Sequence, residues 1–347
     1  MSTLIQGNLE EVRERLITVI STFIPGLVIG SPGLGKSAIV KSIAEEFNLK
    51  VIDVRLSQCD PTDLLGFPIV DKVSKIAEYA PMSTFPLEDT PVPEGYDGWL
   101  VFLDEFNSAD RGTSKAAYKL LHDRMVGQKK LHPKVAMVGA GNHDTDGALT
   151  EELATPLKSR VIHMHVLSDH KVWSKWALEA DIDHRIRSFI RSRPSELNTF
   201  NPDKLEQDVT FACERTWEFA HKILQAAERT NSEQHLLPLL AGTVGEASAR
   251  QFISFTANYN DIASYDDIVR DPHNAKLPTS ASGRYAACGI LSEFCEEESI
   301  KAAMIYLERL PKEFQVIALR DIYAKNSTVL DLAPVQAWIA NNNTVLF

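Results

Sequence analysis

The fold is decided by residues 27–47, LVIGSPGLGKSAIVKSIAEEF, which run from a short apolar stretch through a glycine-rich turn into a helical pattern. Residues 30–37 match G-x-x-x-x-G-K-[ST], and the match lies between a buried strand and a helix start, where a phosphate-binding loop must lie. The glycines let backbone N–H groups curl round phosphate oxygens, while Lys36 reaches the outer phosphates and Ser37 is placed to bind magnesium. We therefore expect a nucleotide to contact Gly30, Ser31, Pro32, Gly33, Leu34, Gly35, Lys36 and Ser37.

The first 166 residues alternate short β-rich runs with helical patterns. The runs are GLVIG, VIDVRL, WLVFLDE, VAMVGAG and VIHMHV, and helical segments such as KSAIVKSIAEEF and TSKAAYKLLHDRM separate them. Continuous Val, Ile and Leu runs that alternate with helices are typical of a parallel sheet covered on both faces. This pattern predicts an α/β nucleotide-binding core over residues 1–168.

From about Lys171 the β-rich runs stop and the patterns become helical. VWSKWALEA, HRIRSFIRS, RTWEFAHKILQAAER and ASARQFISFTANY predict helices of a second domain over residues 169–262. Residues 265–283 concentrate Asp, Pro, Asn, Ser and Gly, so we expect a linker there. A helical C-terminal region then occupies the rest of residues 263–347.

Two further strand ends carry polar residues. The run WLVFLDEF delivers Asp104 and Glu105 at the carboxyl end of a buried strand, where ligands of parallel sheets bind. Asp104 is the expected magnesium ligand, and Glu105 the expected general base for an attacking water. The run VAMVGAGNH ends in Asn142, whose amide is suited to orient that water, although Asn is also a common turn residue.

Composition limits the classes of partner and the compartment. The chain of 347 residues has a formal charge of −11, so broad attraction to nucleic acid is disfavoured and a protein partner is the better expectation. The four cysteines form no CxxC pair, which is typical of free thiols in a reducing compartment. The N-terminus lacks the pattern of a signal peptide, and the apolar segment before residue 30 is broken by Pro25 and Gly26. We therefore predict a cytoplasmic protein that does not span a membrane.

The chain resembles the AAA+ ATPases, specifically the MoxR branch, in four segments taken together: the phosphate loop, the DE strand, GAGN and TEELATPLKSRV. The MoxR branch also shows DLLG, which is present here in DPTDLLGFPIVD at residues 60–71. The resemblance covers residues 10–260 and implies ATP and Mg²⁺ as cofactors and a helical lid. It implies Asn142 as the first sensor and Arg160 as an arginine finger for a neighbouring subunit. The lid stretch FACERTWEF points to Arg215 as the second sensor, but Cys213 and Glu214 stand where the family often has small residues and proline. Arg250 is the alternative.

The same resemblance implies a homo-oligomeric ring of six subunits that uses ATP hydrolysis to remodel a protein partner. In that family the partner is often a protein with a von Willebrand factor A domain. Two insertions typical of the branch are present, over residues 66–98 and residues 126–134, and such insertions tend to face the pore or the partner. They mark Phe67, Lys129 and Lys130 as residues of interest, with plain solvated loops as the alternative.

Two other functions remain open from the sequence. A nucleic-acid motor or loader is opposed by the acidic balance and by the lack of an attached basic or zinc-bearing domain. A scaffold that uses ATP only to hold a ring together is opposed by the joint presence of Lys36, Asp104, Glu105 and Arg160, because a scaffold needs neither a base nor a finger.

Overall fold

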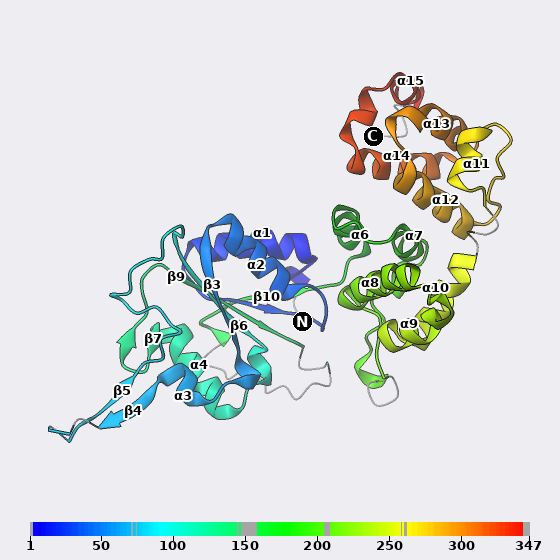
Figure 1. Ribbon diagram of the computed structural model, residues 1–347. Helices are drawn as coiled ribbons and strands as arrows, with labels where there is room; N and C mark the ends of the chain where they lie inside the picture. The colour runs from blue at the N-terminus through cyan, green and yellow to red at the C-terminus, as the bar shows by residue number, and fades with distance from the viewer. Residues whose placement is uncertain are drawn as a thin grey trace. The chain divides into compact units, whose positions relative to one another are not determined.

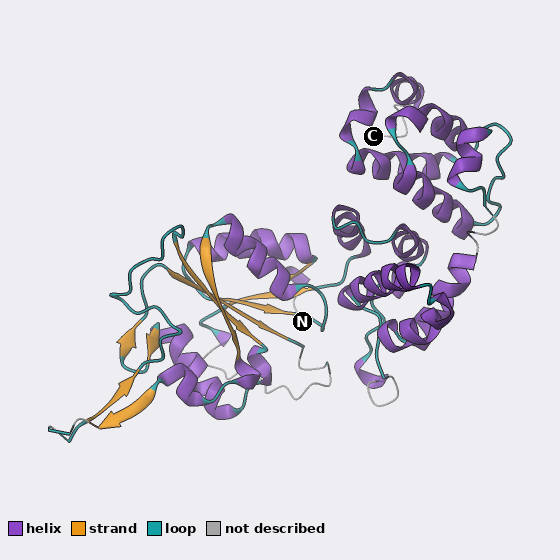
Figure 2. Cartoon of the chain, viewed as in Figure 1, coloured by secondary structure: helices purple, strands orange, loops and turns teal. Residues whose placement is uncertain are grey.

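The computed structural model divides the chain into two compact units (Figures 1 and 2). It describes residues 3–70, 72–73, 75–143, 146, 158–204, 209–257, 259 and 262–342. The first unit comprises Met1–Asp169 with Asn201–Glu206, and the second comprises His170–Phe200 with Gln207–Phe347.

A six-stranded parallel sheet forms the centre of the first unit, in the order β1-β10-β2-β9-β6-β3. Its strands are β1 (Gln6–Gly7), β2 (Gly26–Ile29), β3 (Leu49–Arg55), β6 (Gly98–Asp104), β9 (Val135–Gly141) and β10 (Ile162–Val166). The three central strands β2, β9 and β6 are almost wholly buried. Their carboxyl ends therefore meet at one edge of the sheet, which is where the polar residues expected to bind nucleotide are found.

Helices cover both faces of this sheet, as Figure 2 shows. Side chains of α1 (Leu9–Ser21) and α2 (Lys36–Glu46) pack with Val28, Leu100 and Phe102, while the alternate residues of the same strands pack with α3 (Pro61–Leu65) and α4 (Arg111–Asp123). A strand points successive side chains to opposite faces, so a strand buried on both faces must be apolar throughout. This explains why the strand sequences are continuous apolar runs.

Two short hairpins extend the first unit. One pairs β4 (Phe67–Val70) with β5 (Ala77–Ala80), and the other pairs β7 (Met125–Val126) with β8 (Lys129–Lys130). The β4–β5 hairpin extends away from the sheet in Figure 1, and its side chains are exposed on both faces, including Phe67 at 53% and Ile69 at 57%. The β4–β5 hairpin lies within the insertion at residues 66–98, and the β7–β8 hairpin overlaps the insertion at residues 126–134.

The second unit is helical in its described part. Its helices are α6 (His170–Glu179), α7 (His184–Ser192), α8 (Glu214–Thr230), α9 (Leu236–Val244), α10 (Glu246–Ala257), α11 (Tyr265–Arg270), α12 (Ala281–Phe294), α13 (Ile300–Glu308), α14 (Lys312–Lys325) and α15 (Ala333–Asn342). One cluster of buried side chains runs through them from Trp173 to Trp338. Within this cluster the Phe252 ring packs edge to face with the rings of Phe189 and Trp217, and the Phe189 and Trp217 rings are tilted against each other.

The predicted fold class is confirmed: a parallel sheet flanked by helices is followed by a helical region. The linker predicted over residues 265–283 is partly wrong, because its first six residues form α11. Ser264 caps this helix by accepting a hydrogen bond from the Asp267 backbone, and Ile268 is fully buried. Division of the second unit at residue 262 stays a prediction. Among the described residues, no helix is both long and apolar enough to cross a bilayer.

Candidate nucleotide site

The phosphate-binding loop joins β2 to α2. Gly33 and Gly35 adopt the left-handed backbone conformation, with φ of 83° and 86°, which glycine reaches without steric cost. Gly35 is also the N-cap of α2 and has no side chain to bond the first backbone N–H groups of the helix. These donors and the positive end of the helix dipole are therefore available to an anion.

Lys36 is the buried cation of this loop, with 9% of its surface exposed. Its Nζ donates to the backbone carbonyls of Gly30 at 2.5 Å and Ser31 at 2.9 Å, and to the Asn142 side-chain oxygen at 3.1 Å. These three acceptors are neutral oxygens, and together they fix the position of the ammonium group beside the loop. The carboxyl ends of β2 and β9 are joined through this one side chain.

The acidic pair at the end of β6 lies against the same loop. Ser37 Oγ donates to Asp104 Oδ2 at 2.9 Å, and the other Asp104 oxygen accepts from the Glu105 backbone at 2.9 Å. A hydroxyl and a carboxylate oxygen side by side are the hard ligands that Mg²⁺ uses together with phosphate oxygens and water. Ser37 and Asp104 therefore fit a magnesium site. Among the described residues, no group of three or more His, Cys, Asp or Glu side chains is arranged to hold a metal ion by itself.

Glu105 has an unusual backbone for a residue with a side chain. Its φ of 54° and ψ of 40° place it in the left-handed region, which non-glycine residues occupy uncommonly. This conformation turns the chain sharply after β6, and the Glu105 carboxylate accepts a hydrogen bond from the hydroxyl of Ser57, which follows β3. Glu105 is only partly buried, and its bond to Ser57 holds the carboxylate beside the ends of β3 and β6.

Asn142 follows β9 directly, and its side chain contacts Lys36 as described above. Its main chain is bound by a residue that the sequence did not suggest, the buried Asn107 in the short 3₁₀ turn Phe106–Ser108. Ser57 was also not anticipated. Both residues act on partners 35 and 48 positions away in the chain, and no spacing rule in the sequence marks such contacts.

The structure does not join the three candidate arginines to this group. Arg160 is exposed just before β10, and in the described part no hydrogen bond or ion pair links it to Lys36, Asp104, Glu105 or Asn142. Residues 150–157, which belong to the same sequence motif, lie outside the described residues. Arg215 is exposed in the first turn of α8, and Arg250 pairs with Glu246 on α10, so both belong to the second unit.

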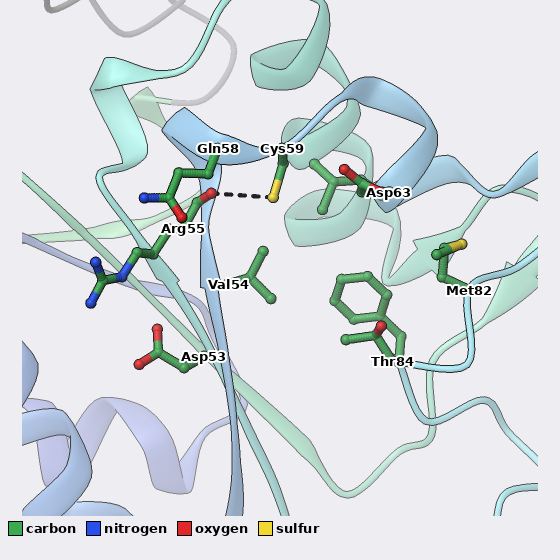
Figure 3. A pocket seen from close by; sticks show the side chains of 10 residues that line it. Asp53, Val54, Arg55, Gln58, Cys59, Asp63, Met82 and Thr84 are labelled. Atoms are coloured by element: carbon green, nitrogen blue, oxygen red, sulfur yellow. Dashed lines mark hydrogen bonds between the residues drawn. The ribbon is translucent and has the colours of Figure 1, made fainter.

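A separate cavity of about 530 Å³ lies along β3 (Figure 3). Figure 3 shows Cys59 between Gln58 and Asp63, with its thiol donating to the Arg55 carbonyl at 3.2 Å. Burial raises the pKa of Cys59, and the negative charges of Asp63 and Asp60 raise it further, so the thiol stays protonated. None of the residues that line this cavity belongs to the nucleotide motifs: Asp53, Val54, Arg55, Gln58, Cys59, Asp63, Leu64, Met82, Thr84 and Phe85.

Comparison with known proteins agrees with this geometry. Residues 26–164, from β2 into β10, match the model of the ATPase family associated with various cellular activities (AAA). A search of curated proteins gave no significant match.

Two solved structures are similar to the chain. One is a protein from Cytophaga hutchinsonii assigned as an ATPase, with 18% identity, a TM-score of 0.36, and coverage of 90% of this chain and 81% of the other. The other is a RuvB point mutant from Thermotoga maritima, with 15% identity, a TM-score of 0.40, and coverage of 77% and 76%.

Proposed function

We propose that the protein is a magnesium-dependent ATPase of the AAA+ MoxR type, which acts as a ring and remodels a protein partner. The observation that carries the proposal is the meeting of Lys36, Ser37, Asp104, Glu105 and Asn142 at the carboxyl ends of three neighbouring strands. An AAA domain over residues 26–164 supports it.

Each residue has a separate task in this reaction. The loop N–H groups and Lys36 would hold the β- and γ-phosphates, and Ser37 and Asp104 would hold the metal ion. Bound Mg²⁺ would neutralise charge that develops on the phosphates. Glu105 takes a proton from the attacking water, and Asn142 orients that water against the γ-phosphate. Hydrolysis thus needs a proton acceptor, metal ligands and a positioned amide, and all of these lie at the same edge of the sheet.

The decisive experiment replaces the base. Glu105→Gln should keep ATP binding and lower turnover at least ~100-fold, the usual scale for loss of a general base. Binding is measured by calorimetry and turnover by phosphate release. Hydrolysis by Glu105→Gln near the wild-type rate would show that Glu105 is not the base.

The ring is supported by Arg160, which is exposed before β10, whereas Lys36 is buried at the start of α2. We infer that Arg160 reaches the nucleotide of a neighbouring subunit, where such fingers contribute roughly 10³ to 10⁵ in rate. Arg160→Ala and Lys36→Ala should each be inactive, and mixing them should restore part of the activity, because some intact sites then face an intact arginine. If mixed oligomers form and stay inactive, Arg160 does not act in trans.

A protein partner is supported by the β4–β5 hairpin, whose apolar side chains are exposed on both faces. The net charge of −11 also disfavours DNA. Glu105→Gln with ATP and magnesium should retain a protein on pull-down, and adding Phe67→Ser and Ile69→Ser should release it while ATP binding is kept. Tight binding to DNA at ~150 mM salt, where non-specific affinity is weak, would favour a nucleic-acid motor instead.

A further inference from the structure

We propose that Asn107 is a positioning residue for ATP hydrolysis, because its side chain fixes the main chain of Asn142. The inference rests on the function proposed above and adds to it a residue outside the nucleotide motifs. Asn107 lies two positions after Glu105, in the turn that follows β6, and only 4% of its surface is exposed.

Asn107 binds both main-chain polar groups of Asn142. Its Nδ2 donates to the Asn142 carbonyl at 2.7 Å, and its Oδ1 accepts from the Asn142 N–H at 3.1 Å. If the Asn107 amide were flipped, its NH2 group would face the Asn142 N–H and its oxygen would face the Asn142 carbonyl. The two hydrogen bonds therefore assign the Oδ1 and Nδ2 positions of Asn107. Two bonds to one residue fix the rotation of its backbone as well as its distance.

The side-chain amide takes over where the sheet ends. The last register pair between β6 and β9 is Leu103 with Gly139, so the backbone of Asn142 lies beyond this ladder. Asn107 supplies the donor and the acceptor that a longer β6 would have provided. Gly141 makes the approach possible, since a Cβ there would lie 2.4 Å from Asn107 Oδ1.

The clamp connects two groups with different tasks. The turn that contains Asn107 begins at Glu105, whose carbonyl accepts from the Ser108 N–H at 3.0 Å. Asn142 in turn presents its side-chain oxygen to Lys36 at 3.1 Å. One buried amide therefore sets the position of the water-orienting group relative to the base, and a misplacement of about 1 Å in such a site costs roughly 10² in rate.

The test uses Asn107→Asp, which keeps the acceptor for the Asn142 N–H but replaces the donor by a second oxygen that faces the Asn142 carbonyl. We expect kcat to fall ~10- to 100-fold, while KM and the Kd for ATP, measured by calorimetry, change less than about threefold because the phosphate loop is untouched. Asn107→Ala, which removes both bonds without adding charge, should behave in the same way if the aspartate variant does not fold.

Thr113→Val is the matched control. Thr113 is equally buried in the same unit and donates to the Cys59 carbonyl at 2.8 Å, away from the nucleotide motifs. If Asn107 only stabilises the unit, both variants should lower the melting temperature and neither should change kcat of the folded protein. That result would overturn the inference.

A double-mutant cycle identifies the route by which Asn107 acts. Asn142→Ala should lower kcat by itself, and adding Asn107→Asp should cost less than about threefold more, because the group being positioned is already gone. Fully additive losses would show that Asn107 does not act through Asn142. If wild type and Glu105→Gln hydrolyse ATP equally, the proposed function fails and this inference fails with it. If only Asn107→Asp is without effect, the positioning role alone is wrong.

Discussion

The two units both bury charged side chains, but they satisfy them differently. In the first unit, Lys36 donates to neutral oxygens at the end of the sheet. In the second, Arg191 on α7 binds both carboxylate oxygens of Asp321 on α14, and Arg187 pairs with Glu293 on α12 at 2.7 Å. In such a pair each charge is balanced by its partner inside the fold, and removal of one partner leaves the other charge uncompensated. Lys36 instead lies in a loop whose backbone N–H groups and helix dipole favour an anionic ligand.

The largest effect is expected at Lys36. Lys36→Ala should raise the Kd for ATP about 30-fold or more, because removal of one partner from a desolvated charge contact costs about 2–5 kcal/mol, and ~1.4 kcal/mol is tenfold. Calorimetry measures the Kd. Lys41→Ala is the control, since Lys41 is on the same helix but is exposed and paired with Asp53 at 3.1 Å. If Lys36→Ala and Lys41→Ala bind ATP with equal affinity, Lys36 does not bind the nucleotide and the contrast with the ion pairs of the second unit fails.

The next effect tests the paired charges of the second unit. Arg191→Met should lower its free energy of unfolding by about 3 kcal/mol, because the Asp321 carboxylate is left without its partner in the core. Arg191→Met with Asp321→Leu should recover most of that loss, and ATP turnover of the folded protein should not change. Urea titration measures the stability.

An exposed pair provides the control for this experiment. Lys222 and Glu218 lie on α8 with side chains 62% and 37% exposed, so Lys222→Ala should cost at most about 0.5 kcal/mol. An equally small loss for Arg191→Met would mean that the pair with Asp321 is not desolvated enough to matter.

Much of the first unit could be predicted because its determinants are local in the sequence. The phosphate loop is a contiguous motif, and strands such as β6 are apolar throughout because both faces are covered. The strand ends that carry Asp104 and Asn142 follow from the same pattern, since parallel strands end at one edge.

The contacts that complete the site could not be predicted in this way. Asn107 and Ser57 reach partners distant in the chain, and neither the period of a helix nor that of a strand encodes such pairs. α11 was missed because Asp and Pro dominate its neighbourhood, although its Ser264 cap and the buried Ile268 stabilise a helix there. In both cases packing between distant segments decides the outcome.

A smaller effect distinguishes the two candidates for the second sensor. Arg215→Ala should raise KM for ATP about tenfold, the scale of one charge-assisted hydrogen bond. Arg250→Ala should leave KM unchanged, because Arg250 Nε and Nη2 both donate to Glu246 on the same helix, at 2.8 and 2.6 Å. Steady-state kinetics measure both. If KM rises for Arg250→Ala and not for Arg215→Ala, Arg250 is the second sensor and Arg215 is not.

The smallest effect concerns His184, the first residue of α7, which lies between the rings of Tyr259 and Phe294. Burial lowers the pKa of His184 below its ordinary value of 6.5. The charges of Asp183 and Glu293 oppose this shift, while those of Arg185 and Arg187 add to it. Between pH 6.5 and the lowered pKa, the unfolded chain binds a proton that the folded chain does not. Stability is therefore full above pH 6.5 and falls as the pH drops through this window, by at most about 1.4 kcal/mol per pH unit.

Urea titrations of the second unit from pH 7.5 to 5 test this dependence. His184→Gln should show a smaller loss of stability with acid than wild type, whereas His235→Gln, which removes an exposed histidine of the same unit, should keep the wild-type slope. Asp183 does not interfere: despite its burial, Arg185 holds the pKa of Asp183 below 3.8, outside this range. If His184→Gln and wild type lose stability in parallel, the imidazole is solvated in the folded protein. His184 would then take up a proton in the folded protein as it does in the unfolded chain. The second unit would therefore hold a cation without a matched ion pair, and it would differ less from the nucleotide site in how it satisfies charge.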